Sequence, residues 1–174
     1  TDDLVLTPIF SRKKKNEIFY LKYNKKNFPK IEKMNIVSGI SKEIGEFEEM
    51  SFAPNFHPAN KNVLLLSAFK NGISNIYELN LNNDKIKKIT YDKSIDTTPF
   101  FSPNGKQIVF CSDRSGSQKL YIMDKNGKNI KKITHGRGNY SKPAWSPDGK
   151  LIAFVKFNKG KSSIGIINPK GESE

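Results

Sequence analysis

The sequence predicts an all-β protein of the β-propeller class, with about four consecutive four-stranded antiparallel blades. Two observations lead to this prediction: a repeat with a period near 45 residues, and short apolar segments separated by turn signals within each copy. A third observation agrees with them, since no segment shows the sustained periodicity of an α-helix.

The repeat is anchored on a proline that opens each copy. The four prolines are Pro8, Pro54, Pro99 and Pro143, so successive copies are offset by 46, 45 and 44 residues. Periods of about 40–50 residues are typical of propeller blades, whereas ankyrin and leucine-rich repeats are shorter. We therefore expect blades over residues 7–47, 53–90, 98–134 and 142–174.

The third copy shows the expected strands most clearly. Residues 99–102 form a short first strand, and Asn104-Gly105 marks the tight turn after it. Residues 107–112 are apolar, β-branched and aromatic, as in a strand that is buried on both faces. Further turn signals then separate strands over residues 119–124 and 130–134. The copy is thus predicted to fold as an antiparallel meander.

A single meander of this kind has two apolar faces and can bury neither face alone. Blades that stack on one another bury both faces and leave only short edges. The fourth copy stops at residue 174, before its outer strand. We therefore expect an incomplete last blade and an open arc of a larger ring. The two exposed blade faces of such an arc favour self-association.

The formal net charge is +13, from 30 Lys and Arg against 17 Asp and Glu. Nearly all of the excess is Lys, and phosphate recognition usually enlists Arg, so we interpret it as solvated surface rather than a nucleic-acid interface. No apolar run approaches the roughly 20 residues of a membrane span, and no secretory leader opens the sequence. Cys111 is the single cysteine and lies in an apolar run, which indicates a buried structural thiol.

No pattern in the sequence points to catalysis, a metal site or a cofactor. His57 and His135 lack the spacing of a zinc site, and a Gly-x-Ser-x-Gly nucleophile elbow is absent. His57 is expected to be a turn or packing residue. Asp113 and Asp148 fall in turns, where aspartates accept hydrogen bonds from backbone N–H groups. We therefore predict a non-catalytic protein that has no cofactor.

The most specific signal is a composite pattern: Pro-x-aromatic-Ser-Pro-Asp/Asn-Gly-Lys, an apolar strand, Ser-Asp-Arg-x-Gly, and then Ile/Leu-Tyr-x-Met-Asp. It is complete over residues 99–124, it begins again at 141–149, and residues 50–54 match the start of another copy. This pattern resembles the propeller repeats of the TolB family of the bacterial Tol–Pal system, closest to alphaproteobacterial versions. Departures are the worn first turn at residues 11–15 and His57 where Ser is usual.

The resemblance implies a six-bladed parent ring, a periplasmic location with a signal peptide absent from this sequence, and function by docking. TolB-like propellers hold the lipoprotein Pal over the mouth of the central channel and support outer-membrane integrity and cell division. TolA and imported colicins are further partners that the resemblance implies.

Family members contact Pal through loops just before the inner strands. Matched to this sequence, the implied Pal-binding residues are Met50, Ala53 and Thr97, with Ser141 and Lys142 by analogy of position. Ala53 and Thr97 lie just before prolines, and a proline by itself favours extended backbone in the residue that precedes it.

Two alternatives remain open from the sequence. The propellers of prolyl-oligopeptidase-like serine peptidases carry similar repeats and filter substrate for a separate hydrolase domain. The peptidase alternative predicts a Gly-x-Ser-x-Gly domain elsewhere in the parent protein. A WD-type adaptor would instead close each blade with a Trp-Asp dipeptide, which this sequence lacks.

Overall fold

The computed structural model describes residues 4–24, 27–44 and 50–172, with backbone alone at residues 24, 27–29 and 50–53. Every regular element in this part of the chain is a β-strand. The strands form four antiparallel sheets in chain order, three of four strands and a last one of three. The predicted fold class, with an incomplete last blade, is confirmed. None of the described residues forms an apolar helix of membrane-spanning length.

Each sheet is one blade. The first blade comprises β1 (Leu4–Phe10), β2 (Glu17–Asn24), β3 (Asn27–Asn35) and β4 (Ser41–Glu43). The second comprises β5 (Met50–Phe56), β6 (Val63–Lys70), β7 (Ile73–Asn80) and β8 (Lys85–Lys88). The third comprises β9 (Thr97–Phe101), β10 (Gln107–Ser112), β11 (Lys119–Asp124) and β12 (Lys131–Lys132). The fourth comprises β13 (Asn139–Trp145), β14 (Ile152–Asn158) and β15 (Lys161–Ile167).

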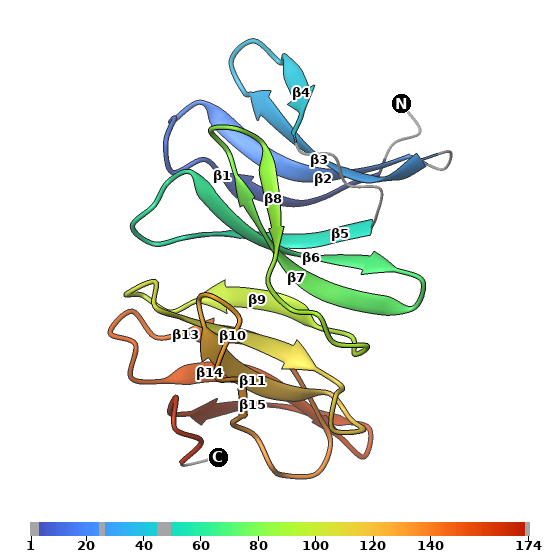
Figure 1. Ribbon diagram of the computed structural model, residues 1–174, viewed down its shortest axis with the longest axis vertical. Coiled ribbons are helices and arrows are strands. Elements are labelled where there is room, and N and C mark those ends of the chain that lie inside the picture. Colours follow the sequence, from blue (N-terminus) through green and yellow to red (C-terminus); the bar gives the residue numbers. More distant parts are fainter. Residues whose placement is uncertain (1–3, 25–26, 45–49, 173–174) are drawn as a thin grey trace.

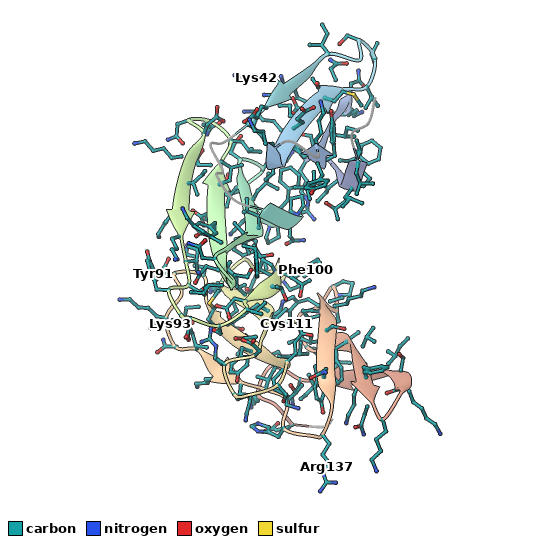
Figure 2. The ribbon with its side chains drawn as sticks, turned by 90° about the vertical axis from the view of Figure 1, so that its right-hand side faces the viewer. Lys42, Tyr91, Lys93, Phe100, Cys111 and Arg137 are labelled. Carbon is teal, nitrogen blue, oxygen red and sulfur yellow. The ribbon has the colours of Figure 1, made fainter. Side chains whose placement is uncertain are left out.

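The four blades stack into a curved arc, with the first and fourth blades at opposite ends (Figure 1). The first strands contact one another in order, β1 with β5, β5 with β9 and β9 with β13, whereas β4, β8 and β12 contact only their own sheets. Figure 2 shows Phe100, in β9, on the concave side of the arc and Tyr91 and Lys93 on the convex side. The first strands therefore line the concave side.

The core consists of three apolar layers, each between two neighbouring blades. Side chains alternate along a strand, so one strand serves two layers. In β6, Leu66 packs toward the first blade and Leu65 toward the third. In β10, Phe110 packs toward the second blade and Cys111 toward the fourth. The apolar second strands predicted from the sequence are explained by this double burial.

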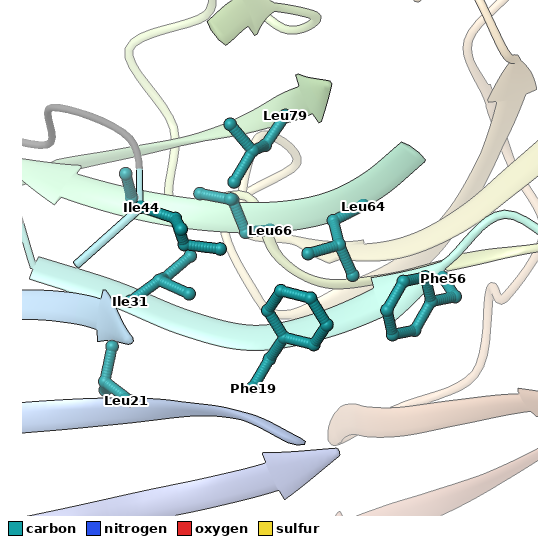
Figure 3. Close-up of a cluster of buried hydrophobic side chains, with 9 residues drawn as sticks. Phe19, Leu21, Ile31, Ile44, Phe56, Leu64, Leu66 and Leu79 are labelled. Carbon is teal, nitrogen blue, oxygen red and sulfur yellow. The ribbon is translucent and has the colours of Figure 1, made fainter. Parts of the chain in front are cut away.

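The layer between the first and second blades is drawn in Figure 3. It includes an edge-to-face contact between the rings of Phe19 and Phe56, whose centroids are 5.4 Å apart. Aromatic pairs with this geometry add about 0.5–1.5 kcal/mol beyond the burial of their area. Inter-blade layers, rather than contacts within one sheet, thus hold the arc together.

Cys111 is fully buried in the layer between the third and fourth blades. Burial raises the pKa of its thiol to about 11, because a thiolate is poorly solvated there. The expected buried structural thiol is confirmed.

The outward faces of the two end blades carry exposed apolar side chains. Val5 in β1 is 52% exposed and Ile164 in β15 is 83% exposed. Such surfaces favour association, so self-association of the chain stays a prediction.

Each first strand carries a β-bulge at its proline. In the third blade Thr98 and Pro99 together oppose the single residue Phe110, and the registers of the other three blades shift at the equivalent place. The residues before three of these prolines have positive φ: 49° at Thr7, 48° at Thr98 and 51° at Lys142. The general preference for extended backbone before a proline is overridden by the bulge at these three positions. Thr97 lies one residue before Thr98 and belongs to the extended strand β9, as expected.

His57 closes the turn after β5 in place of the serine that other copies use. In the third blade Ser102 Oγ accepts a hydrogen bond from the Gln107 N–H at 3.0 Å. In the second blade His57 Nδ1 accepts from the N–H groups of Ala59 at 3.2 Å and Asn60 at 3.0 Å. Its ring also packs edge-to-face on a neighbouring aromatic ring, and burial lowers its pKa. His57 is thus a turn and packing residue, as expected.

Candidate partner-binding site

The candidate site lies where the chain enters the first strands of the blades. We call the segments that join an outer strand to the next first strand leading loops: residues 89–96 before β9 and 133–138 before β13. The loop before β5, residues 45–49, lies outside the described residues. Because β9 contacts both β5 and β13, the first strands of three successive blades lie side by side.

The structure brings two of the sequence-predicted residues together. Thr97 pairs with Cys111 and Ser141 pairs with Val155, so both stand at the equivalent place, directly before the bulge, in adjacent first strands. Both side chains are half-buried. Lys142 follows at the bulge of β13 and is exposed.

The other two predicted residues are placed only through their backbone. Met50 begins β5 and pairs with Phe69, and Ala53 lies in the bulge region of the same strand, between Phe52 and Asn55. Their side chains lie outside the described residues. By register Ala53 corresponds to Thr98 of the third blade rather than to Thr97.

A buried ion pair anchors the leading loop of the third blade. The carboxylate of Asp96 is fully buried, and Arg114 Nη2 lies 3.0 Å from each of its oxygens. Arg114 Nη1 also lies 3.4 Å from the carboxylate of Asp92. The guanidinium stands over the rings of Phe110 and Tyr121, at 5.3 and 5.1 Å from their centroids. The loop is thereby fastened to the β10–β11 turn.

Backbone contacts hold the same loop from two further directions. Asp96 N–H donates to the Ser74 carbonyl at 2.9 Å, and Ser74 Oγ–H donates back to the Asp96 carbonyl at 2.7 Å. Ile95 N–H donates to Asp113 Oδ1 at 2.8 Å. Asp113 therefore serves as a backbone acceptor, the structural role expected for it.

The leading loop of the fourth blade is anchored differently. Lys119 Nζ donates to the carbonyls of Gly136 at 2.6 Å and Gly138 at 2.7 Å. Tyr140 occupies the position that Asp96 holds in the third blade, and its side chain is fully buried. Its ring centroid lies 4.7 Å from Lys119 Nζ and 5.2 Å from Lys156 Nζ. Cation–π contacts here replace the ion pair of the third blade.

The four anchoring side chains, Asp96, Arg114, Lys119 and Tyr140, were not predicted from the sequence. The Ser-Asp-Arg-x-Gly motif predicted only a turn, and the pattern assigned no role to Asp96 or Lys119. A usable signal was present, since antiparallel pairing of the first two strands brings the residue before one strand to the turn that follows the other. Opposite charges at those two places, Asp96 and Arg114, could have been paired from the pattern alone.

Asp148, at the opposite end of its blade, accepts hydrogen bonds from Ser146 Oγ at 2.6 Å and from the Lys150 N–H at 3.1 Å. The Ser146 bond is the largest cause that lowers the pKa of Asp148. Asp148 therefore accepts within its own turn, whereas Asp113 accepts from Ile95 of the leading loop, and the two carboxylates act separately. Across the ranges with described side chains, no group of three His, Cys, Asp or Glu gathers in metal-binding geometry.

Four stacked antiparallel meanders, with their first strands lining one concave side, define a β-propeller repeat protein. The chain belongs to the TolB beta propeller domain family, whose profile matches residues 1–174.

Solved structures agree with this assignment. TolB from Acinetobacter baumannii is 29% identical, with a TM-score of 0.83 over 99% of this chain and 42% of that chain. A putative TolB from Agrobacterium tumefaciens is 16% identical, with a TM-score of 0.81 over 90% of this chain and 59% of that chain. This chain thus spans less than two thirds of the length of either.

An enzyme shares the fold as well. A puromycin-hydrolyzing peptidase from Mycobacterium tuberculosis is 11% identical, with a TM-score of 0.78 over 98% of this chain and 28% of that chain. At such identity the similarity shows the fold alone.

Proposed function

We propose that this chain is part of a non-catalytic, periplasmic scaffold of the Tol–Pal system and binds Pal where the chain enters its first strands. The observation that carries the proposal is the placement of Thr97 and Ser141 at equivalent positions of adjacent first strands, in a chain of the TolB family. Residues that converge from several blades form one composite surface, as binding loops on a rigid scaffold do.

The anchoring of the leading loops supports a binding role. The Asp96–Arg114 pair and the Lys119 hydrogen bonds hold the backbone that precedes Thr97 and Ser141. A surface that is ordered before its partner arrives loses less conformational entropy on binding, and this favours affinity. The bulges at Thr98 and Lys142 bend the first strands at the same level.

The wider role follows from the same proposal. As part of a Tol–Pal scaffold the chain would support outer-membrane integrity and cell division, and TolA and imported colicins would be further partners. Met50 and Ala53, in the neighbouring strand β5, would extend the Pal surface on one side. Lys142 would extend it on the other.

Calorimetric titration with purified Pal tests the proposal, using the wild-type chain and the Thr97→Arg variant. We expect saturable binding by the wild type and at least about tenfold weaker binding by the variant, because a bulky cation at a half-buried site blocks close contact. The matched control is Ala59→Arg, an exposed position in the turn at the other end of the second blade.

Equal binding by Thr97→Arg and the wild type would move the Pal surface away from these strand ends. Absence of binding by a wild-type chain with an intact β-sheet circular dichroism spectrum would refute Pal binding for this chain. The peptidase alternative would then be tested by looking for a Gly-x-Ser-x-Gly domain in the parent gene.

A further inference from the structure

A pocket lies between the first turns of the third and fourth blades. Its volume is about 310 Å³, at the lower end of the roughly 300–1,000 Å³ of small-ligand sites. Its lining includes side chains of both turns and of the strands beside them: Ser102, Asn104, Gln107, Trp145, Asp148 and Gly149. Trp145 ends β13, whereas Thr97 begins β9, so the pocket and the proposed Pal surface lie at opposite ends of the first strands.

The repeat makes positions in neighbouring junctions between blades comparable. Phe101 and Trp145 are equivalent, because each ends its first strand opposite the start of the apolar second strand. His57 and Ser102 are equivalent, because each directly follows its first strand and its N–H donates to a carbonyl of the second strand. The surroundings of His57 can therefore be compared with those of Ser102.

In the junction between the second and third blades the imidazole of His57 fills the equivalent space. Its ring packs edge-to-face on Phe101, with centroids 4.6 Å apart, and a Cβ atom at Gly105 would collide with it. Nδ1 accepts two backbone N–H groups, so the hydrogen of the neutral ring is on Nε2, the atom nearest to Gly105. Burial lowers the pKa of His57, and a hydrogen bond with the Gly105 backbone acts in the opposite direction. One imidazole thus bridges an aromatic ring and a turn glycine of the next blade.

In the junction between the third and fourth blades the much smaller Ser102 stands where His57 would be. Ser102 Oγ–H donates to Asn104 Oδ1 at 2.8 Å, within its own turn. The aromatic residue opposite is correspondingly less covered, since Trp145 is half-buried whereas Phe101 is only 6% exposed. The exchange of histidine for serine therefore leaves one face of the junction open.

The turn glycine of the fourth blade is less covered as well. The N–H groups of Gly105 and Gly149 each donate to the carbonyl three residues earlier, so the two glycines are equivalent. Gly105 is buried beneath the imidazole, whereas Gly149 is half-buried. Trp145 is held in place, because its indole N–H donates to the Phe100 carbonyl at 3.3 Å. The pocket thus contains the place that an imidazole takes in the neighbouring junction.

The polar groups of the pocket suit a ring that carries an N–H group. Asp148 occupies the turn position that Asn104 holds in the third blade, so a carboxylate stands where an amide stands beside His57. Its Oδ1 accepts hydrogen bonds within its own turn, and its Oδ2 lies 3.7 Å from the exposed Nζ of Lys150. A carboxylate accepts an imidazole N–H and stabilises the charged ring, whereas a phenyl ring offers no donor.

We propose that this pocket binds the imidazole ring of a histidine side chain from a protein partner. The ring would lie against Trp145 and donate to Asp148, as His57 fills the neighbouring junction from within the chain. Asn104 and Asp148 are exposed at the mouth of the pocket, so a ring carried on a peptide backbone can enter between the two turns. The inference goes beyond the proposed Pal contact and shares no residue with it.

The test is an NMR titration of the ¹⁵N-labelled chain with N-acetylhistidine methylamide, a histidine side chain on a peptide-like backbone. Trp145 is the single tryptophan, so its indole N–H gives one resonance that reports on the pocket. We expect a saturable shift with a Kd on the order of 1 mM. Ser102→His should weaken binding at least about tenfold, because the new imidazole occupies the pocket.

Two further variants keep the test independent of how Ser102→His folds. His57→Ser makes the reverse exchange and should add a second saturable response, at the Gly105 N–H, while the Trp145 response is retained. Asp148→Asn copies the turn of the third blade and should weaken binding at least about threefold, because the charge of the acceptor is lost. Circular dichroism verifies the β-sheet content of each variant.

An unchanged response in folded Ser102→His, or no response in the wild type, would overturn the proposal. Equal binding of N-acetylphenylalanine methylamide would overturn the choice of imidazole. Free imidazole that binds at least about tenfold more tightly than the peptide-like compound would overturn a protein partner in favour of a small molecule. Failure of the Pal proposal is distinguishable, since Thr97→Arg should leave the Trp145 response unchanged and Ser102→His should leave the Pal titration unchanged.

Discussion

The leading loops of the third and fourth blades stand at equivalent places in the repeat but are held by different electrostatic means. In the third blade Asp96, a fully buried carboxylate, is neutralised by Arg114. In the fourth blade Tyr140 takes the place of the carboxylate, and Lys119 and Lys156 lie over its ring. The same backbone architecture therefore accepts either an ion pair or cations that lie over an aromatic ring.

The difference shows that a repeat can anchor the same loop by different electrostatic contacts without changing its fold. A buried carboxylate needs a cation and hydrogen bonds, and Arg114 supplies the cation within the third blade. A buried ring needs no counter-charge, and Lys119 there binds backbone carbonyls as well as the ring. The first arrangement pairs opposite charges, and the second holds cations with uncharged groups.

Removal of Arg114 should have the largest effect on this comparison. Arg114→Ala leaves Asp96 buried and unpaired, and breaking a buried pair in this way costs about 3–5 kcal/mol in the free energy of unfolding. Urea unfolding followed by circular dichroism measures the change. Arg137→Ala, at an exposed position of the other loop, serves as control and should change stability by no more than about 0.5 kcal/mol. Similar losses in the two variants would show that the ion pair is not the anchor.

Replacement of the ring in the fourth blade should have the next largest effect. Tyr140→Leu removes the cation–π contacts with Lys119 and Lys156 and leaves a small void, at a cost of about 2–3 kcal/mol. Tyr140→Phe keeps the ring and should cost less than about 1.5 kcal/mol. The same urea titration measures both, and equal losses would argue against a role for the aromatic face.

The Cys111 thiol, buried between the third and fourth blades, makes the free energy of unfolding depend on pH in the alkaline range. The folded pKa of Cys111, about 11, lies above the unfolded value of 9.0, so the protonated thiol stabilises the fold. This contribution is fully present below about pH 9 and is lost as the pH rises toward 11, by about 2 kcal/mol. Comparison with Cys111→Ala isolates it, because all other groups titrate alike in both chains. A wild-type curve that runs parallel to the variant curve would contradict the assignment.

A change in salt concentration should have the smallest effect on the free energy of unfolding. It should affect the leading loop of the fourth blade more than that of the third. Raising NaCl from about 0.05 to 0.5 M screens the repulsion among the exposed cations near the fourth leading loop, Arg137, Lys159 and Lys161, and should stabilise the wild type by about 0.5 kcal/mol. The variant R137Q/K159Q/K161Q should lose much of this gain. The loss caused by Arg114→Ala should change little with salt, because a buried pair is weakly screened. A strong salt dependence of that loss would show that solvent reaches the pair.

The sequence predicted the repeat, the turns and the apolar second strands, because each depends on residues near one another in the chain. The candidate site was predicted less completely. The positions of Thr97 and Ser141 followed from the repeat, whereas the left-handed backbone of Thr98 and Lys142 was not predicted. The local preference before proline was overridden by the bulge that bends each first strand.

By itself the sequence determined the fold class, the period of the blades and the burial of Cys111, because hydrophobic alternation and turn chemistry are local properties. Only the tertiary structure decided that Arg114 also reaches Asp92, that Lys119 holds the next leading loop, and that Lys119 and Lys156 both lie over the ring of Tyr140. These contacts join residues far apart in the chain, which antiparallel pairing and the tertiary fold bring together.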